Sequence, residues 1–169
     1  MTTIGEAVEV RRAAKLVVTR ENEQGETEYL FVAGKSKRLN LLGGGIDEGE
    51  SISEARSRET CEEIGAMACD ALVITDPNIG MVLGEITDNK LALWEVGMAQ
   101  LPRDIELTGE VVANWMTLEQ LANYDGPISA LAMRALTLTG VDITRQPITG
   151  HAIAMRNDGL DADNLSLAA

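Results

Sequence analysis

The chain has 169 residues, a formal net charge of −13 and a sequence pI of about 4.4. Such an acidic protein is a poor candidate for a general binder of nucleic acids or anionic membranes, because phosphate contacts need basic side chains. Its 45% hydrophobic and 24% charged residues are ordinary for a soluble globular protein. We expect one domain at 1–156, followed by a flexible tail at 157–169 that catalysis does not need.

The first predicted elements form a β-hairpin. Residues 8–19 are rich in Val and Ala and suit a strand, the polar run at 21–26 predicts a turn, and residues 29–33 suit the returning strand. A basic loop follows, with the residues Lys35, Lys37 and Arg38. These side chains either are solvated and balance the negative charge of nearby acids, or they contact substrate phosphate. We take Arg38 as the candidate phosphate ligand.

A helix is predicted between Ser51 and Gly65. Ser51 and Glu54 have the spacing of a capping box, which marks a helix start, and a glycine is a natural C-terminal stop. On this helix Glu59 and Glu63 are four residues apart, so they share a face.

The second half of the chain predicts more strands, then short helices. Strands are expected at 71–75, 81–86, 90–99 and 111–116, with a loop at 76–80. Thr117 opens a second capping box for a helix that reaches about Tyr124, and a third helical segment covers 129–139. This order predicts a mixed α/β fold rather than regular βαβ alternation.

Cys61 and Cys69 are the only cysteines, and neither lies in a zinc-binding pattern. We expect two free thiols in a reducing compartment. Glu6 interrupts the N-terminus where a signal peptide needs an apolar run, and Glu95 interrupts the best apolar segment. These features predict a cytoplasmic protein.

Three carboxylates crowd the predicted helix at Glu59, Glu62 and Glu63. Their mutual repulsion is relieved by a hard divalent cation, and Mg²⁺ or Mn²⁺ suits such oxygen ligands. Glycines at 43–45 precede the helix and let the backbone approach a phosphate or offer a carbonyl to the metal.

Residues 44–66 resemble the Nudix box, the signature of Nudix hydrolases. The matched positions are Gly44, Glu50, Arg58, Glu59, Glu62, Glu63 and Gly65. Thr60 and Ala66 stand where that family usually has bulkier aliphatic residues, and Leu42 replaces a proline that often precedes the glycines. The resemblance implies an α/β/α sandwich around a mixed β-sheet.

The resemblance also implies a metal site. Glu59 and Glu63 are the strongest candidate ligands, with Glu62 as a further ligand and the Gly43 carbonyl completing the shell. Gly44 and Gly45 are then candidates for contact with substrate.

Other roles follow from the same resemblance. Glu50 and Arg58 would form a buried ion pair that fixes the loop against the helix. The general base is either a glutamate of the box, here Glu62, or an acid from a late loop. Glu110 is the candidate for that late acid, with Glu106 second.

The implied activity is Mg²⁺- or Mn²⁺-dependent hydrolysis of a diphosphate linkage in a nucleoside diphosphate derivative, such as ADP-ribose or a nucleotide sugar. Two alternatives stay open: a nucleoside triphosphate or dinucleoside polyphosphate as substrate, and a nucleotide sensor without turnover. The intact glutamates argue against the sensor. The expected partner is a small molecule rather than nucleic acid or membrane, and a homodimer is left open. Trp115 and Phe31 are expected in the core rather than stacked on a base.

Overall fold

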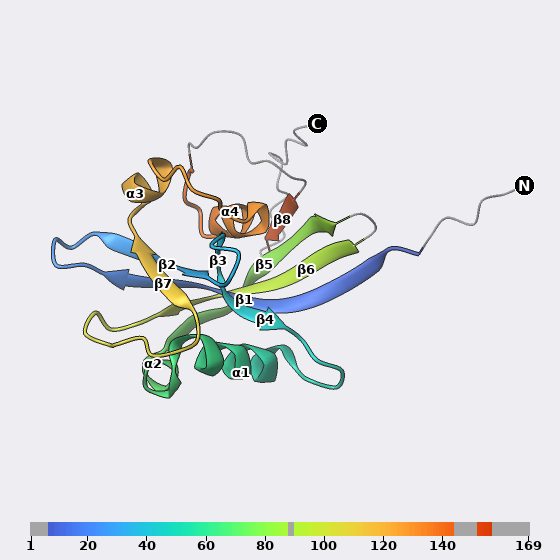
Figure 1. Ribbon diagram of the computed structural model, residues 1–169, viewed down its shortest axis with the longest axis horizontal. Coiled ribbons are helices and arrows are strands. Elements are labelled where there is room, and N and C mark those ends of the chain that lie inside the picture. The colour runs from blue at the N-terminus through green and yellow to red at the C-terminus, as the bar shows by residue number, and fades with distance from the viewer. Residues whose placement is uncertain (1–6, 88–89, 144–151, 157–169) are drawn as a thin grey trace, which may run out of the picture.

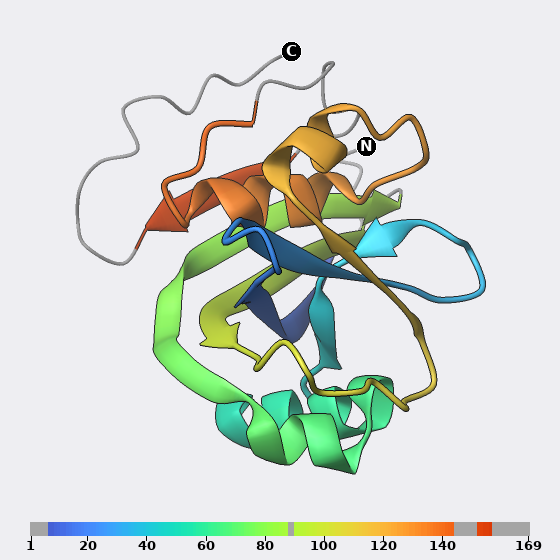
Figure 2. The ribbon, with the colours of Figure 1, turned by 90° about the vertical axis from the view of Figure 1, so that its left-hand side faces the viewer.

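The described strands form one eight-stranded sheet that has helices on both faces (Figure 1, Figure 2). The computed structural model describes residues 7–87, 90–143 and 152–156. In chain order the elements are β1 (Glu9–Glu21), β2 (Thr27–Ala33), β3 (Leu39–Asn40), β4 (Leu42–Gly45), α1 (Ile52–Ile64), α2 (Ala66–Ala71), β5 (Val73–Thr87), β6 (Lys90–Gln100), β7 (Val112–Met116), α3 (Leu118–Ala122), α4 (Ala130–Thr137) and β8 (Ala152–Arg156). The predicted α/β/α sandwich around a mixed sheet is confirmed.

Strand β1 organises the sheet. The strand order is β3-β2-β1-β6-β5-β8, while β4 pairs with β1 and β7 pairs with β2. β1 runs parallel to β6 and antiparallel to both β2 and β4. On one edge, β1 pairs with β4 up to Leu16 and with β2 from Thr19 onward. This change of partner leaves the glycines of β4 beside the middle of β1.

Two apolar cores lie on opposite faces of the sheet, as the alternation of side chains along a strand requires. Leu16 and Val18 of β1 pack with Ile64 on the side of α1 and α2. Val17, between them, packs with Leu136 on the side of α3 and α4. Figure 2 shows the two helical layers below and above the sheet.

Three residues that depart from the expected family pattern fit into this packing in different ways. Leu42 is fully buried and pairs with Leu16. Thr60 is only 1% exposed, and its Oγ1 has no hydrogen-bond partner among the described residues. Ala66 is exposed and starts α2, so a bulkier residue is not needed there.

The sequence does not predict α2, β3, β4 or β8. Helix α2 follows α1 at once, because Gly65 takes a φ of 92° that ends α1 and turns the chain. The strand expected at 71–75 therefore begins only at Val73. The predicted capping box at Thr117 is confirmed and opens α3, and the third helical segment is confirmed as α4 with Ser129 as its N-cap.

The loop predicted at 76–80 is wrong, because β5 continues through it. Asp76 pairs with Met98, and Gly80 pairs with Val96. Three residues of β5 lie between these two pairs but only one residue of β6 does, so β5 bulges out of the sheet. The bulge accommodates Pro77, which cannot donate to a ladder, and the Arg56 side chain donates to its carbonyl at 2.9 Å.

The expectation of two free thiols is also wrong. Cys61 in the last turn of α1 and Cys69 in α2 form a disulfide, with their Cα atoms 5.0 Å apart. The turn at Gly65 folds α2 back so that the two side chains meet. A disulfide is uncommon in a reducing compartment, so the cysteines no longer support a cytoplasmic location.

No helix in the described ranges is long and apolar enough to cross a membrane. The tail predicted at 157–169 lies outside the described residues, and the domain boundary at 156 stays a prediction.

Candidate active site

Helix α1 begins with the predicted capping box. The Ser51 Oγ accepts the Glu54 N–H at 3.2 Å, and the Glu54 carboxylate accepts the Ser51 N–H at 2.8 Å. The box fixes where the first turn begins, and the helical period then places Glu59 and Glu63 on one face.

Two adjacent glycines of β4 contact this face. The Gly43 N–H donates to Glu63 Oε2 at 2.7 Å. A Cβ on Gly44 would collide with the Glu59 carboxylate, and a Cβ on Gly43 would collide with the Ala14 carbonyl of β1. Gly43 also has a φ of 111°, which favours glycine. Glycine is therefore required at Gly43, whereas a side chain at Gly44 would displace the Glu59 carboxylate from β4.

Glu63 lies in an environment that disfavours its charge. Burial raises the pKa of the Glu63 carboxyl, and the nearby Glu59 and Glu62 carboxylates raise it further. The hydrogen bond from Gly43 and the charge of Lys15 act in the opposite direction. A partly buried carboxylate beside other acids is stabilised by a bound cation.

Arg58 joins the β4–α1 loop to the helix. Its Nε and Nη2 donate to the two carboxylate oxygens of Glu50, each at 2.9 Å. Its Nη1 donates to Glu59 Oε1 at 2.6 Å, and its Nη2 also donates to the Gly45 carbonyl at 3.0 Å. The predicted pair with Glu50 is present, but it is not buried, because 32% of the Arg58 side chain is exposed. Arg58 thus holds the loop and orients Glu59.

Replacing Arg58 with alanine is expected to lower both the melting temperature and turnover. Glu50 would lose its cation and Glu59 its orienting donor. Because the pair is partly exposed, the loss of stability should be smaller than for a buried ion pair. Melting followed by circular dichroism and kcat/KM check this, with Arg103→Ala as a control at an exposed loop arginine. An Arg58→Ala protein that melts at the wild-type temperature would show that the contact does not stabilise the fold.

The same contacts predict a pH dependence of stability. Hydrogen bonds from Arg58 and from the Asp47 N–H lower the pKa of the Glu50 carboxyl from 4.5 to about 2. A carboxyl whose pKa is lowered in the folded state stabilises the fold at pH values above its ordinary pKa. This contribution is lost as the pH falls from 4.5 towards 2. The advantage in melting temperature of wild type over Glu50→Gln should therefore shrink across this window. An advantage that is constant or grows towards low pH would contradict the assignment.

The loop between β6 and β7 closes over the end of α1. The Thr108 N–H donates to the Ile64 carbonyl at 3.0 Å, and the Glu110 N–H donates to the Glu62 carbonyl at 3.1 Å. These bonds satisfy carbonyls that the helix end leaves free. The predicted late acid Glu110 is thus anchored by its backbone next to Glu62, and its side chain is exposed. Glu106 is also exposed, without such a bond to α1.

Arg38 lies on the exposed loop between β2 and β3, where its N–H donates to Ser36 Oγ at 3.4 Å. The next residue, Leu39, exchanges backbone hydrogen bonds with the segment before α4. Among the described residues no ion pair joins Arg38 to Glu59 or Glu63. Its role as a phosphate ligand stays a prediction.

Sequence reasoning missed Lys15. It lies in the middle of β1 and is only 7% exposed, and its Nζ donates to the carbonyls of Gly43 and Leu41. Burial lowers the pKa of the Lys15 ammonium, and the Glu63 and Glu59 carboxylates oppose this. A lone lysine inside an apolar strand segment, Ala-Ala-Lys-Leu-Val-Val, was the signal that could have marked it.

The donors fit a hard divalent cation, although the ligands are not already clustered. In the part of the chain that is described, no three His, Cys, Asp or Glu side chains are gathered closely enough to hold a metal ion. Glu59 and Glu63 nevertheless approach the same glycine pair, and the Glu62 side chain, 55% exposed, lies in the last turn of α1 with an oxygen 4.0 Å from Arg58 Nη1. Carboxylate oxygens beside backbone carbonyls are the ligands that Mg²⁺ and Mn²⁺ prefer.

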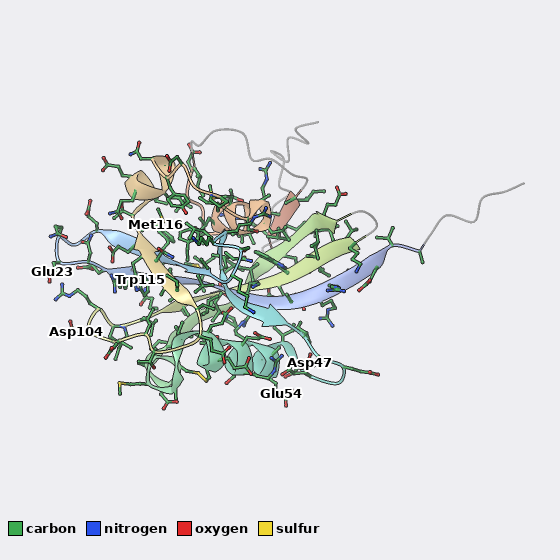
Figure 3. The ribbon with its side chains drawn as sticks, viewed as in Figure 1. Glu23, Asp47, Glu54, Asp104, Trp115 and Met116 are labelled. Carbon is green, nitrogen blue, oxygen red and sulfur yellow. A yellow bond between two sulfur atoms is a disulfide. The ribbon has the colours of Figure 1, made fainter. Side chains whose placement is uncertain are left out.

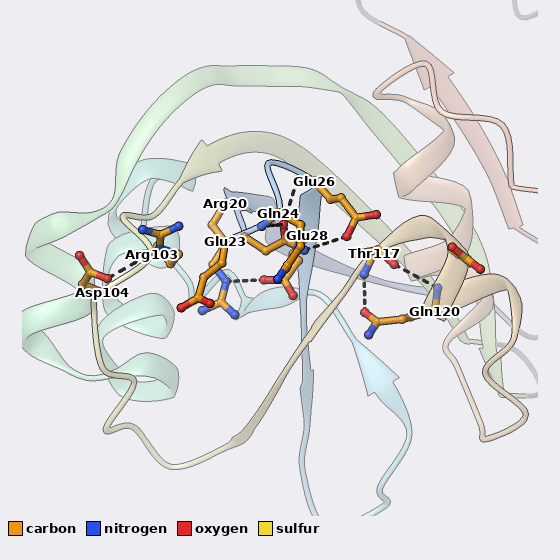
Figure 4. A pocket seen from close by; sticks show the side chains of 11 residues that line it. Arg20, Glu23, Gln24, Glu26, Glu28, Arg103, Asp104, Thr117 and Gln120 are labelled. Atoms are coloured by element: carbon orange, nitrogen blue, oxygen red, sulfur yellow. Dashed lines mark hydrogen bonds and ion pairs between the residues drawn. The ribbon is translucent and has the colours of Figure 1, made fainter.

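A polar pocket lies at another part of the molecule. It is formed by the β1–β2 hairpin, the loop after β6 and the start of α3, and none of the predicted site residues lines it (Figure 4). Figure 3 places Glu23 and Asp104 of this region at the left-hand end, away from Asp47 and Glu54 near the start of α1. Nearby, the Arg20 guanidinium covers the Trp115 ring at 4.2 Å. Phe31 is fully buried, and Trp115 is partly buried and packs against the core, as the sequence predicted.

Comparison with known proteins agrees with the fold and the box. The family model of the NUDIX domain matches residues 10–136. The chain is similar in structure to a C. elegans Ap4A hydrolase, with a TM-score of 0.57, 23% identity, and 76% of this chain and 90% of that chain covered. It is also similar to the MutT protein from Methanosarcina mazei Go1, with a TM-score of 0.58, 21% identity, and 80% and 96% covered.

A third similar structure is a NUDIX family hydrolase from Clostridium perfringens, with a TM-score of 0.56, 20% identity, and 79% and 97% of the two chains covered. No match was found among curated proteins. The chain belongs to the NUDIX domain family, as the box predicted.

Proposed function

We propose that this protein hydrolyses a diphosphate linkage in a nucleoside diphosphate derivative, of the ADP-ribose or nucleotide-sugar type, with Mg²⁺ or Mn²⁺. The observation that carries the proposal is the approach of both Glu59 and Glu63 to the Gly43–Gly44 backbone. Two carboxylates beside a backbone without side chains supply the oxygen ligands that a hard divalent cation prefers, and they let phosphates approach that cation closely.

Each residue has a defined part in this proposal. Glu59 and Glu63 would hold the metal, and Glu62 would add a further oxygen. When bound, the cation neutralises charge on the phosphate oxygens and makes a water more acidic. Arg58 keeps the Glu59 carboxylate oriented. Glu110 accepts the proton of the attacking water.

Contact with the substrate falls to residues around β4. Gly44 and Gly45 carry no side chain of their own, and Gly45 is exposed, so a phosphate can approach this backbone closely. Arg38, on the loop before β3, supplies positive charge in an acidic protein. The substrate is a small molecule, and both a homodimer and a cytoplasmic location remain proposals from the sequence.

A second substrate class is a dinucleoside polyphosphate or a nucleoside triphosphate. Two proteins of similar fold are described as an Ap4A hydrolase and a MutT protein, which favours testing this class. At 21–23% identity these proteins share the fold, so they do not decide the substrate.

A nucleotide panel with Mg²⁺ tests the proposal. ADP-ribose, a nucleotide sugar, Ap4A and a nucleoside triphosphate are each incubated with wild type and with the double variant Glu59→Gln/Glu63→Gln. Products are separated by chromatography. We expect a nucleoside monophosphate from ADP-ribose or the nucleotide sugar with wild type only. Turnover of Ap4A or the triphosphate alone would favour the second class, and no turnover of any compound would contradict the proposed activity.

A further inference from the structure

Lys15 is a buried cation inside the candidate metal site. Its side chain is 7% exposed, although lysine is among the residues least often buried without a partner. It stands on β1 at the point where β1 pairs with the glycines of β4, and its Cα partner is Gly43. The strand register therefore directs Lys15 to the same residue that contacts Glu63.

Every contact of the Lys15 ammonium serves to hold a positive charge. Its Nζ donates to the Gly43 carbonyl and, at 3.3 Å, to the Leu41 carbonyl. It also lies 5.1 Å from the centre of the Trp94 ring, whose face attracts cations. Carbonyl oxygens and an aromatic face replace the water that the ammonium loses on burial.

Gly43 joins this cation to the metal ligands. Its N–H contacts Glu63, and its carbonyl accepts from Lys15. The resemblance to Nudix hydrolases assigned this same carbonyl to the metal. A divalent cation bound to this carbonyl would share the oxygen with the Lys15 ammonium. Two positive charges that contact the same oxygen repel strongly in a partly buried site.

We propose that Lys15 is a positioning residue of the metal site, whose ammonium takes the place of a divalent cation at the Gly43 carbonyl. Bound metal is then confined to the carboxylates of Glu59 and Glu63, and the site holds fewer ions, or holds them more weakly, than it would with a neutral side chain. This inference rests on the proposed metal site but does not depend on the substrate.

The test compares metal binding by wild type and Lys15→Met without substrate. Methionine keeps the length of an unbranched side chain and removes both the charge and the donor. Lys90→Met is the matched control, because Lys90 lies on β6 opposite Glu9, six residues along β1 from Lys15. Electron paramagnetic resonance of free Mn²⁺ gives the number of bound ions and their affinity, and the rise in melting temperature with Mn²⁺ is a second readout.

We expect Lys15→Met to bind one more Mn²⁺ ion, or to bind Mn²⁺ at least about tenfold more tightly, since a charge has been removed beside the site. Lys90→Met should bind as wild type does. Unchanged or weaker binding by Lys15→Met would overturn the proposal, because Lys15 would then be a core residue or a support for the ligands. If Lys15→Met does not fold, Lys15→Gln is used, and the same outcomes apply.

The two proposals fail in different ways. Binding of Mn²⁺ by wild type without a change in the Lys15 variant would overturn only the role of Lys15. If neither protein binds Mn²⁺, the metal site of the proposed function fails as well.

Discussion

Replacing Glu63 with glutamine is expected to remove most activity, and raising the metal concentration should restore part of it. The carboxylate lies beside Glu59 and Glu62 and accepts the Gly43 N–H, so the variant removes one of the two proposed anionic ligands of the metal. The expected loss exceeds the roughly 10–100-fold that is typical of residues that only support a metal ligand. Titration of kcat/KM against Mg²⁺ measures both effects.

Glu48→Gln is the matched control for this variant. Glu48 lies in the exposed loop between β4 and α1, and its replacement removes the same charge without touching the glycines. Its activity should stay close to wild type. A Glu63→Gln enzyme with wild-type dependence on Mg²⁺ would show that Glu63 is not a ligand.

Replacing Glu110 with glutamine should lower turnover while the affinities for metal and substrate hold. General base catalysis contributes roughly 10²–10⁴-fold, and a loss in kcat of this size is expected. Glu110 is positioned near the candidate site, because its N–H donates to the Glu62 carbonyl in the last turn of α1. Steady-state kinetics at saturating Mg²⁺ and a Mn²⁺ titration provide the two readouts.

Glu62→Gln is the competing variant, because Glu62 is the alternative base. Its side chain is exposed and lies 4.0 Å from Arg58. If Glu110→Gln keeps wild-type turnover while Glu62→Gln loses it without losing metal, the base lies in the box and not in the late loop. Glu106→Gln, in the same loop but without a backbone bond to α1, should remain active.

Local signals predicted the parts of the fold that depend on neighbours in sequence. Ser51 and Glu54 marked the start of α1, and Gly65 marked its end, because capping and a positive φ are properties of a few adjacent residues. The same reasoning located Thr117 at the start of α3. The spacing of the acids was sufficient to identify the pair at Glu59 and Glu63.

The features that depend on tertiary structure were missed. The bulge in β5 is stabilised by pairing with β6 and by the Arg56 side chain, neither of which is visible in the local sequence. The disulfide of Cys61 and Cys69 needs the short helix α2, which was not predicted. Lys15 could be read as an interruption of a strand, but only the register with Gly43 brings it into the site.

The central claim is that Glu59 and Glu63 bind a catalytic divalent cation against the glycines of β4. Crystals soaked in Mn²⁺ test it most directly, through anomalous scattering from the metal. We expect a peak within bonding distance of both carboxylates, roughly 2.0–2.2 Å as for hard divalent cations of this size. The claim would be contradicted by a Mn²⁺ peak elsewhere, with Glu63 still hydrogen-bonded to the Gly43 N–H and Glu59 still hydrogen-bonded to Arg58.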